Sequence, residues 1–190
     1  MIYGKEMWGP KAWHLLHAFS INNNSGKKKH NYYIFYTTFA YIIPCIKCSD
    51  HYSNIIYYKI PIIEEHIDKT YLKKWVYSIH NEVNSILNKT KYKYEIYCND
   101  CNKINNEDIY FFINTVYQNL EYDTMSLYNY DQIYNFFINF CKLYPDRKRR
   151  IRLKELINNT EFKEIYTPKQ FMNWFIKNNK LFETIFHNDK

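Results

Sequence analysis

The stretch of sequence that decides the fold is residues 68–88, DKTYLKKWVYSIHNEVNSILN. Asp68 can cap a helix, because its carboxylate accepts hydrogen bonds from backbone N–H groups that have no partner inside the helix. Apolar side chains then recur at the three- and four-residue spacing of one helix face. They are Leu72, Trp75, Val76, Ile79, Val83, Ile86 and Leu87. The pattern predicts a long amphipathic helix with one face in a helical core, ending near Asn88.

The rest of the chain also favours helices. Three Gly and five Pro in 190 residues are too few for the turns of an all-β fold. Helices are expected over residues 8–20, 30–42 and 45–58, and near 107–120, 130–143 and 168–186. Pro10 suits the first turn of the first helix, where a missing N–H costs nothing. Seven aromatic residues after position 103 can form a second helical core. They are Phe111, Phe112, Phe136, Phe137, Phe140, Trp174 and Phe175. We predict an all-α protein.

Composition and charge exclude several classes of protein. No stretch approaches the roughly 18 apolar residues of a membrane span, and no apolar signal-peptide region follows Met1, so we expect a soluble, cytosolic protein with no membrane partner. The net charge of +7 fits a Lys-rich surface better than a nucleic-acid site. Lys27–Lys29 reflects compositional drift, and the densest basic run, at the helix start expected near Arg147, is isolated in the sequence. A nucleic-acid partner is therefore not expected.

Two cysteine pairs carry the chemistry. Cys45 and Cys48 stand two residues apart after Pro44, where a helix start would stabilise a thiolate and lower its pKa. The thiolate is the nucleophile of disulfide exchange. Cys98 and Cys101 repeat the spacing, and the two pairs together also match the four ligands of a structural zinc site. Spacing alone leaves two alternatives open: a redox centre, and a zinc-stabilised helical binding module.

Polar residues also lie on the core face of the central helix. His80 and Asn84 are neighbours at i and i+4, and His17 ends the apolar face of the first helix. Buried polar groups need hydrogen-bond partners, which other core residues or a ligand could supply. With Trp8, Trp13 and Trp75 nearby, the two His suit a planar polar ligand stacked between aromatic rings.

Three segments resemble the motifs of one enzyme family. Residues 8–17, WGPKAWHLLH, resemble the Gly-x-x-x-Trp-x-x-Leu-His signature of the Erv/ALR sulfhydryl oxidases. Residues 43–52, IPCIKCSDHY, resemble their Pro-Cys-x-x-Cys motif, and residues 80–89, HNEVNSILNK, resemble their flavin motif His-Asn-x-Val-Asn-x-x-Leu-x-Lys. The motifs stand in the family's order and cover residues 8 to 101. Thr90 stands where the family usually has Pro, and Pro10 replaces a polar residue.

The resemblance implies a four-helix bundle that binds FAD, usually as a homodimer. Its activity would be oxidation of protein dithiols to disulfides, with molecular oxygen as acceptor and hydrogen peroxide as product. By position, Cys48 would lie next to the flavin and Cys45 would face the substrate, with no metal involved. Residues at the cofactor would be Trp8, Gly9, Trp13, His17, His51, His80, Asn81, Val83, Asn84, Lys89 and Tyr92. Cys98 and Cys101 would form a second redox pair or a staple.

Domain limits and location follow from the same resemblance. Residues 1–102 are expected to form the FAD-binding domain, and residues 103–190 an additional helical region that docks substrate or extends a dimer. A cytosolic disulfide-forming enzyme is unusual, because that compartment is reducing. Large DNA viruses are a natural source of one, so we expect the host cytoplasm or the virion, with the mitochondrial intermembrane space as the alternative.

Overall fold

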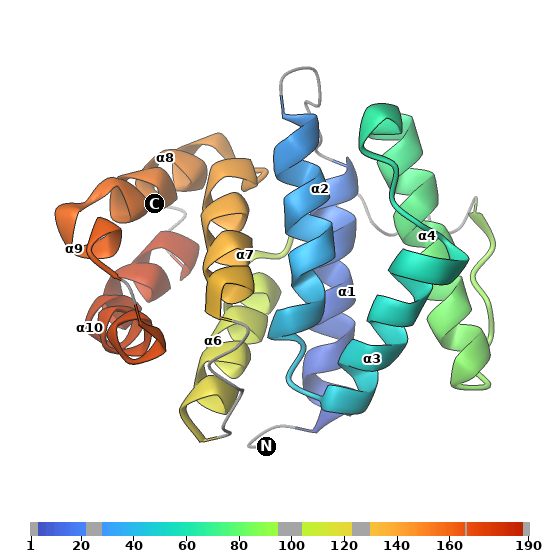
Figure 1. Ribbon diagram of the computed structural model, residues 1–190, viewed down its shortest axis with the longest axis horizontal. Helices are drawn as coiled ribbons and strands as arrows, with labels where there is room; N and C mark the ends of the chain where they lie inside the picture. The colour runs from blue at the N-terminus through green and yellow to red at the C-terminus, as the bar shows by residue number, and fades with distance from the viewer. Residues whose placement is uncertain (1–3, 22–27, 95–103, 123–129, 166, 188–190) are drawn as a thin grey trace.

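The computed structural model describes residues 4–21, 28–94, 104–122, 130–165 and 167–187 (Figure 1). Every regular element within those ranges is a helix, which confirms the all-α prediction. The helices are α1 (Lys5–Ile21), α2 (Lys29–Thr38), η2 (Phe39–Ile42), α3 (Ile46–Asn54), η3 (Ile55–Lys59), η4 (Glu64–His66), α4 (Lys69–Ile86), α6 (Asn106–Tyr122), α7 (Tyr130–Leu143), α8 (Arg147–Asn158), α9 (Thr160–Lys163) and α10 (Pro168–His187). Within those ranges, no helix combines the length and the apolar character needed to cross a bilayer.

The helix α4 forms as its sequence predicts. Asp68 Oδ1 accepts a hydrogen bond from the Tyr71 backbone N–H at 2.7 Å and so caps the helix. The first four residues of the apolar stripe, from Leu72 to Ile79, are buried. The last two, Ile86 and Leu87, are exposed, so the prediction of a continuous buried stripe is wrong at its end. The helix stops there, and Asn88 adopts a φ of 53°, a left-handed conformation that Asn tolerates.

One predicted boundary needs correction, and two predicted helices change helix type near the middle or end of their predicted ranges. The first helix begins at Lys5 rather than at residue 8, so Pro10 lies inside α1 and not in its first turn. The second changes to a 3-10 helix at Phe39, five residues before Pro44. The third continues as a π-helix from Ile55. Side-chain periodicity does not report which carbonyl each N–H bonds, so the sequence could not predict these changes.

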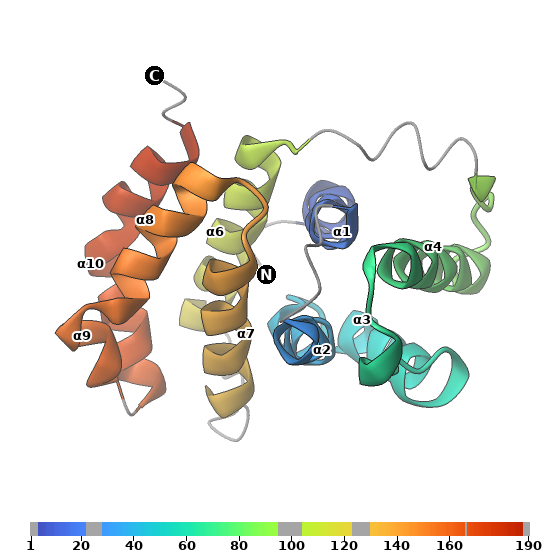
Figure 2. The ribbon, with the colours of Figure 1, turned by 90° about the horizontal axis from the view of Figure 1, so that it is seen from above.

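Helices α1 to α4 surround one part of the core (Figures 1 and 2). The Tyr36 hydroxyl on α2 donates to the Leu16 carbonyl on α1 at 3.0 Å. Tyr52 on α3 in turn donates to the Tyr36 carbonyl at 3.0 Å. The indole N–H of Trp75 on α4 donates to the Ile60 carbonyl at 2.9 Å. Each buried ring therefore has a partner for its polar atom while it ties two elements together.

The C-terminal helices pack directly on α1 and α2 (Figure 2). The Phe35 ring on α2 lies 5.2 Å from that of Phe136 on α7, and the Phe39 ring lies 5.8 Å from that of Phe112 on α6. Six of the seven aromatic residues expected in a second core are buried, but that core is continuous with the first. Phe111 is the exception, half-exposed beneath the Lys11 ammonium at 4.9 Å. The domain boundary after residue 102 stays a prediction.

Candidate active site

A disulfide joins Cys45 and Cys48 at the start of α3, with their Cα atoms 5.2 Å apart. Cys45 is the N-cap residue in extended conformation, and its Sγ accepts a hydrogen bond from the Cys48 backbone N–H at 3.3 Å. Both Cys are half-buried against the core, whereas Ile46 between them is 76% exposed. A thiolate released at Cys45 would lie at the positive end of the helix dipole, which stabilises its negative charge. The pair is thus both accessible and activated.

The same disulfide removes support for the zinc alternative. Zinc needs thiolate ligands, and the sulfurs of Cys45 and Cys48 are bonded to each other. Cys98 and Cys101 lie outside the described residues. Within the described ranges, no group of three or more His, Cys, Asp or Glu side chains is arranged to hold a metal.

Four predicted cofactor residues from α1, α4 and the segment after α4 meet in an aromatic cluster. The Trp13 and His80 rings are stacked, with centroids 4.0 Å apart and planes 7° from parallel. His17 Nε2 lies 2.9 Å from His80 Nδ1, within hydrogen-bond distance. Tyr92, on the segment after α4, brings its ring centroid to 5.2 Å from that of His80. We call Trp13, His17, His80 and Tyr92 the aromatic cluster.

Burial keeps the two histidines of the aromatic cluster neutral. Burial lowers the pKa of His17 well below its usual value, and a proton on His80 or His14 would lower it further. Burial also lowers the pKa of His80 to about 4, with a smaller contribution from the Lys89 ammonium. Two neutral imidazoles can share one hydrogen bond, in which one ring nitrogen donates and the other accepts. The imidazoles of the cluster are therefore uncharged at neutral pH.

The two asparagines of the flavin-like motif hold the segment that follows α4. The Asn81 Nδ2 group donates to the Tyr92 carbonyl at 3.1 Å, and Asn81 Oδ1 accepts from the Tyr92 N–H at 2.8 Å. Asn84, which is buried, donates from Nδ2 to the Thr90 carbonyl at 3.4 Å. These bonds place Tyr92 against His80. Val83 is half-buried against the core beside them.

Other predicted site residues lie outside the aromatic cluster. Trp8 is buried, with its ring 6.4 Å from that of Phe112, and its Nε1 has no hydrogen-bond partner among the described residues. Trp75 packs edge-on against Tyr36, and His51 on α3 is exposed. A helical wheel assigns a residue to a face but does not say which neighbouring helix that face meets.

These residues fit a dinucleotide such as FAD in three respects. The aromatic cluster offers a stacking surface for a planar ring. A side chain added at Gly9 would meet no protein atom within 4 Å, which leaves room for a ligand beside α1. Lys89, Lys91 and Lys93 expose ammonium groups along the segment that carries Tyr92, and these suit a pyrophosphate. The sequence prediction missed Lys91 and Lys93, although their alternation with Tyr92 and Tyr94 was a visible signal.

An accessible helix-capping disulfide, on a helix that packs against the one bearing His80, defines a thiol–disulfide redox protein built on a helical bundle. The chain belongs to the Erv1 / Alr family, whose model matches residues 10–110.

Viral proteins are among its relatives. It is 32% identical over 93 residues to the "Probable FAD-linked sulfhydryl oxidase R368" of Acanthamoeba polyphaga mimivirus, a match that covers 47% of this chain and 64% of that protein. It is 29% identical over 85 residues to the "FAD-linked sulfhydryl oxidase" of an African swine fever virus isolate, a match that covers 43% of this chain and 69% of the viral one. The chain thus spans less than two thirds of the mimivirus protein. No solved structure matches the chain significantly.

Proposed function

We propose that this protein is an FAD-dependent sulfhydryl oxidase that forms disulfides in protein dithiols, with oxygen as the final acceptor. The observation that carries the proposal is the disulfide between Cys45 and Cys48 at the exposed start of α3. The family membership and the names of the two viral relatives support it.

The thiol chemistry begins at Cys45. A substrate thiolate attacks Cys45 Sγ, the bond between the two Cys sulfurs breaks, and Cys48 leaves as a thiolate. The second substrate thiolate then attacks the substrate sulfur of this mixed disulfide. The substrate disulfide forms, Cys45 leaves as a thiolate, and two electrons now reside on the Cys pair. The helix dipole stabilises the Cys45 thiolate as leaving group.

The Cys pair must then be oxidised again. Bound FAD supplies a two-electron acceptor that oxygen regenerates, which yields hydrogen peroxide. Trp13, His17, His80, Asn81, Asn84 and Tyr92 would hold it, directly or by fixing the segment after α4. The neutral His17 and His80 would bind the flavin without adding charge. Cys48 would face the cofactor and Cys45 the substrate.

We also propose that two copies of the chain form a homodimer. The faces of α1 and α2 turned towards α6 and α7 are buried within the chain, so two copies would have to meet elsewhere. Tyr57 and Tyr58 on the π-helix are 46% and 82% exposed and are suitable interface residues. Light scattering at several protein concentrations tests this: a dimer mass supports the dimer, and a monomer mass throughout removes it.

We place the enzyme in the cytoplasm of an infected cell or in a virion. Both named relatives come from viruses, which supports this location over the mitochondrial intermembrane space. Localisation of the tagged protein to mitochondria would contradict it.

Absorption and oxygen uptake test the oxidase proposal together. The purified protein should absorb near ~450 nm, as oxidised flavins do, and should consume oxygen when a small dithiol is added. Cys141→Ser is the matched control, because Cys141 is a buried free thiol outside the site. A colourless protein that loses its structure with a chelator would instead support the zinc-stabilised module.

A further inference from the structure

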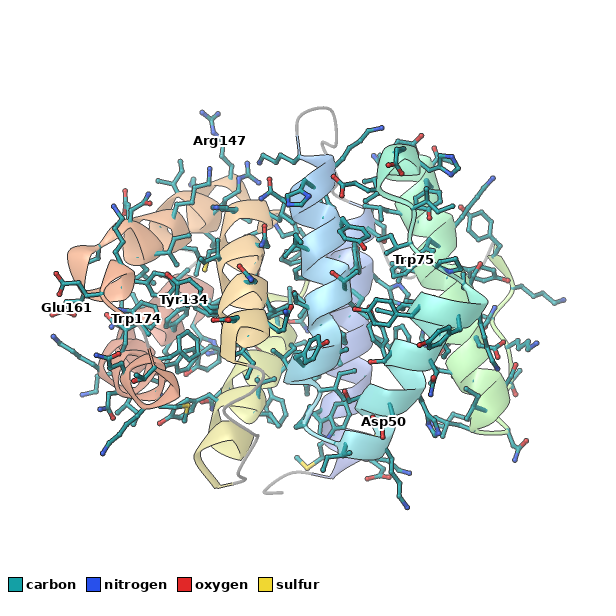
Figure 3. All side chains as sticks on the ribbon, viewed as in Figure 1. Asp50, Trp75, Tyr134, Arg147, Glu161 and Trp174 are labelled. Carbon is teal, nitrogen blue, oxygen red and sulfur yellow. A yellow bond between two sulfur atoms is a disulfide. The ribbon has the colours of Figure 1, made fainter. Side chains whose placement is uncertain are left out.

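Away from the candidate active site, cationic side chains are concentrated on α8. Residues 147–154 contain six cationic residues and no acidic one: Arg147, Lys148, Arg149, Arg150, Arg152 and Lys154. Arg149 is buried, with Nε donating to the Ile185 carbonyl at 3.0 Å and Nη1 3.6 Å from Asp146 Oδ1. The other five are exposed or half-exposed, and Figure 3 shows Arg147 extending away from the ribbon.

The fold adds a cation from a distant segment. Lys28 immediately precedes α2, more than a hundred residues before α8 in the chain. Partial burial and then the positive charges of Arg150 and Lys154 lower the pKa of the Lys28 ammonium, so Lys28 lies near enough to both to be repelled by them. We call Lys28, Arg147, Lys148, Arg150, Arg152 and Lys154 the α8 basic surface.

The acids that flank the basic run, Asp146 and Glu155, form no ion pair with the α8 basic surface in the part of the chain that the structure describes. Asp146, the nearest acid before α8, is engaged as its cap and by Arg149. Arg150 Nη1 donates to the Tyr144 and Pro145 carbonyls at 2.6 and 3.1 Å, which fixes the guanidinium without cancelling its charge. No described carboxylate lies within ion-pair distance of any of the six. Like charges held together repel, and a bound polyanion would relieve that repulsion.

We propose that the α8 basic surface binds the phosphate backbone of nucleic acid. Three of its six cations are arginines, whose planar guanidinium groups bind phosphate oxygens in pairs. Residues 147–154 extend for about 10 Å along the helix, long enough to reach more than one phosphate. Ile151 is the one large apolar side chain that α8 exposes among the described residues, so the surface lacks the apolar face that inserts into a membrane.

Nucleic acid bound at the α8 basic surface would hold the enzyme in place and would not direct a substrate to the Cys45–Cys48 disulfide. The helix α8 lies on the opposite side of the molecule from α3 and its disulfide (Figures 1 and 2). The sequence argued against a nucleic-acid partner because the net charge fits a Lys-rich surface and the densest basic run is isolated in the chain. The structure brings Lys28, from a distant part of the chain, near to that run.

Fluorescence anisotropy with a short labelled duplex DNA of mixed sequence tests the proposal on the full chain. The variant is Arg147→Gln/Lys148→Gln/Arg152→Gln, which changes three exposed side chains. The matched control is Lys69→Gln/Lys74→Gln/Lys163→Gln, which removes the same charge from exposed positions on α4 and α9. Titrations at about 50 and 200 mM salt give the slope of log affinity against log salt, whose magnitude decreases by roughly 0.9 for each phosphate that the protein no longer neutralises.

We expect the α8 variant to bind DNA at least ~10-fold more weakly, with a salt slope shallower by about 2 to 3. The control should bind within ~2-fold of the unchanged protein, and oxygen uptake should be unchanged in both. Equal losses in the two variants would overturn the proposal, because binding would then follow net charge. Absence of binding at the lower salt, or equal binding to polyglutamate or to phosphatidylserine vesicles, would overturn it as well.

Discussion

His17 Nε2 on α1 lies 2.9 Å from His80 Nδ1 on α4, and both imidazoles are largely buried. A proton added to this pair would place a charge where burial disfavours it. The contact therefore connects the bundle's stability to pH.

The first prediction is that the protein loses stability in acid. The folded pKa of His80 is about 4 against 6.5 unfolded, so between these values the unfolded chain binds more protons. The contribution of His80 to the free energy of unfolding is largest above pH 6.5. It should decrease as the pH falls from 6.5 to about 4, by on the order of 3 kcal/mol. Denaturant titrations at stepped pH measure it. His80→Gln should reduce the dependence and exposed His66→Gln should keep it; identical pH profiles for both would contradict the assignment.

The second prediction concerns the paired hydrogen bonds between Asn81 and the Tyr92 backbone. Asn81→Ala removes both and frees the segment that carries Tyr92. We expect a loss of about 1–2 kcal/mol in unfolding free energy. FAD occupancy and the unfolding free energy should fall together, because a ligand bound only to the folded state stabilises that state.

Asn84→Ala should act in the same direction through its bond to Thr90. Exposed Asn158→Ala, on α8, is the control. Absorbance per protein and melting temperature are the two readouts, and full flavin occupancy in both site variants would restrict these asparagines to a structural role.

The third prediction concerns the C-terminal helices. A chain truncated after Lys103 exposes the rings of Phe19, Phe35 and Phe39, each of which contributes roughly 1.5–3 kcal/mol when buried. The sequence alone predicts that residues 1–102 fold by themselves and bind FAD. Because the core is continuous with the C-terminal helices, we instead expect the truncated chain to aggregate or to unfold at a much lower temperature than the full protein. A soluble, cooperatively melting truncated chain that binds FAD would instead support an independent domain over residues 1–102.

The fourth prediction concerns Cys98 and Cys101, which lie outside the described residues. A disulfide between them would close a very short loop, and chain entropy gives short loops little stabilisation. We therefore expect a relay that passes electrons from a protein substrate to Cys45 and Cys48. Cys98→Ser/Cys101→Ser should lose activity on a protein thiol and keep it on a small dithiol. Unchanged rates on both, with a lower melting temperature, would identify a structural pair.

Local features of the fold could be predicted from the sequence. The Asp68 cap and the start of the α4 stripe depend on residues within one or two turns, and the pattern over residues 130–143 coincides with α7. Features set by contacts between distant segments could not. Nothing near Asn81 indicates that its amide bonds Tyr92, and nothing near Lys28 indicates that the charge of Arg150 acts on it.

The candidate site also has some features that the sequence predicts and others that depend on contacts between distant segments. Periodicity placed His17 and His80 on inward faces, and the structure adds that they meet each other and Trp13. Trp8 and Trp75 also face inward, yet they pack against Phe112 and Tyr36. The choice of neighbour depends on how the helices pack, which the pattern of a single helix does not contain.

Two single substitutions test which of Cys45 and Cys48 faces the flavin and which faces the substrate. Both Cys45→Ser and Cys48→Ser should stop oxygen uptake and keep bound FAD, because Trp13, His17 and His80 lie on α1 and α4. Cys45→Ser should also leave Cys48 as a free thiolate beside the flavin, seen as a long-wavelength charge-transfer band. The same band in Cys48→Ser alone would reverse the two roles.

The most direct measurement is anaerobic mixing of the protein with a small dithiol while absorbance near ~450 nm is followed. We expect rapid loss of the flavin absorbance in the unchanged protein and in Cys141→Ser, and retention in Cys48→Ser with its FAD still bound. Loss of the absorbance in Cys48→Ser at the unchanged protein's rate would contradict the central claim that electrons reach the cofactor through the Cys45–Cys48 disulfide.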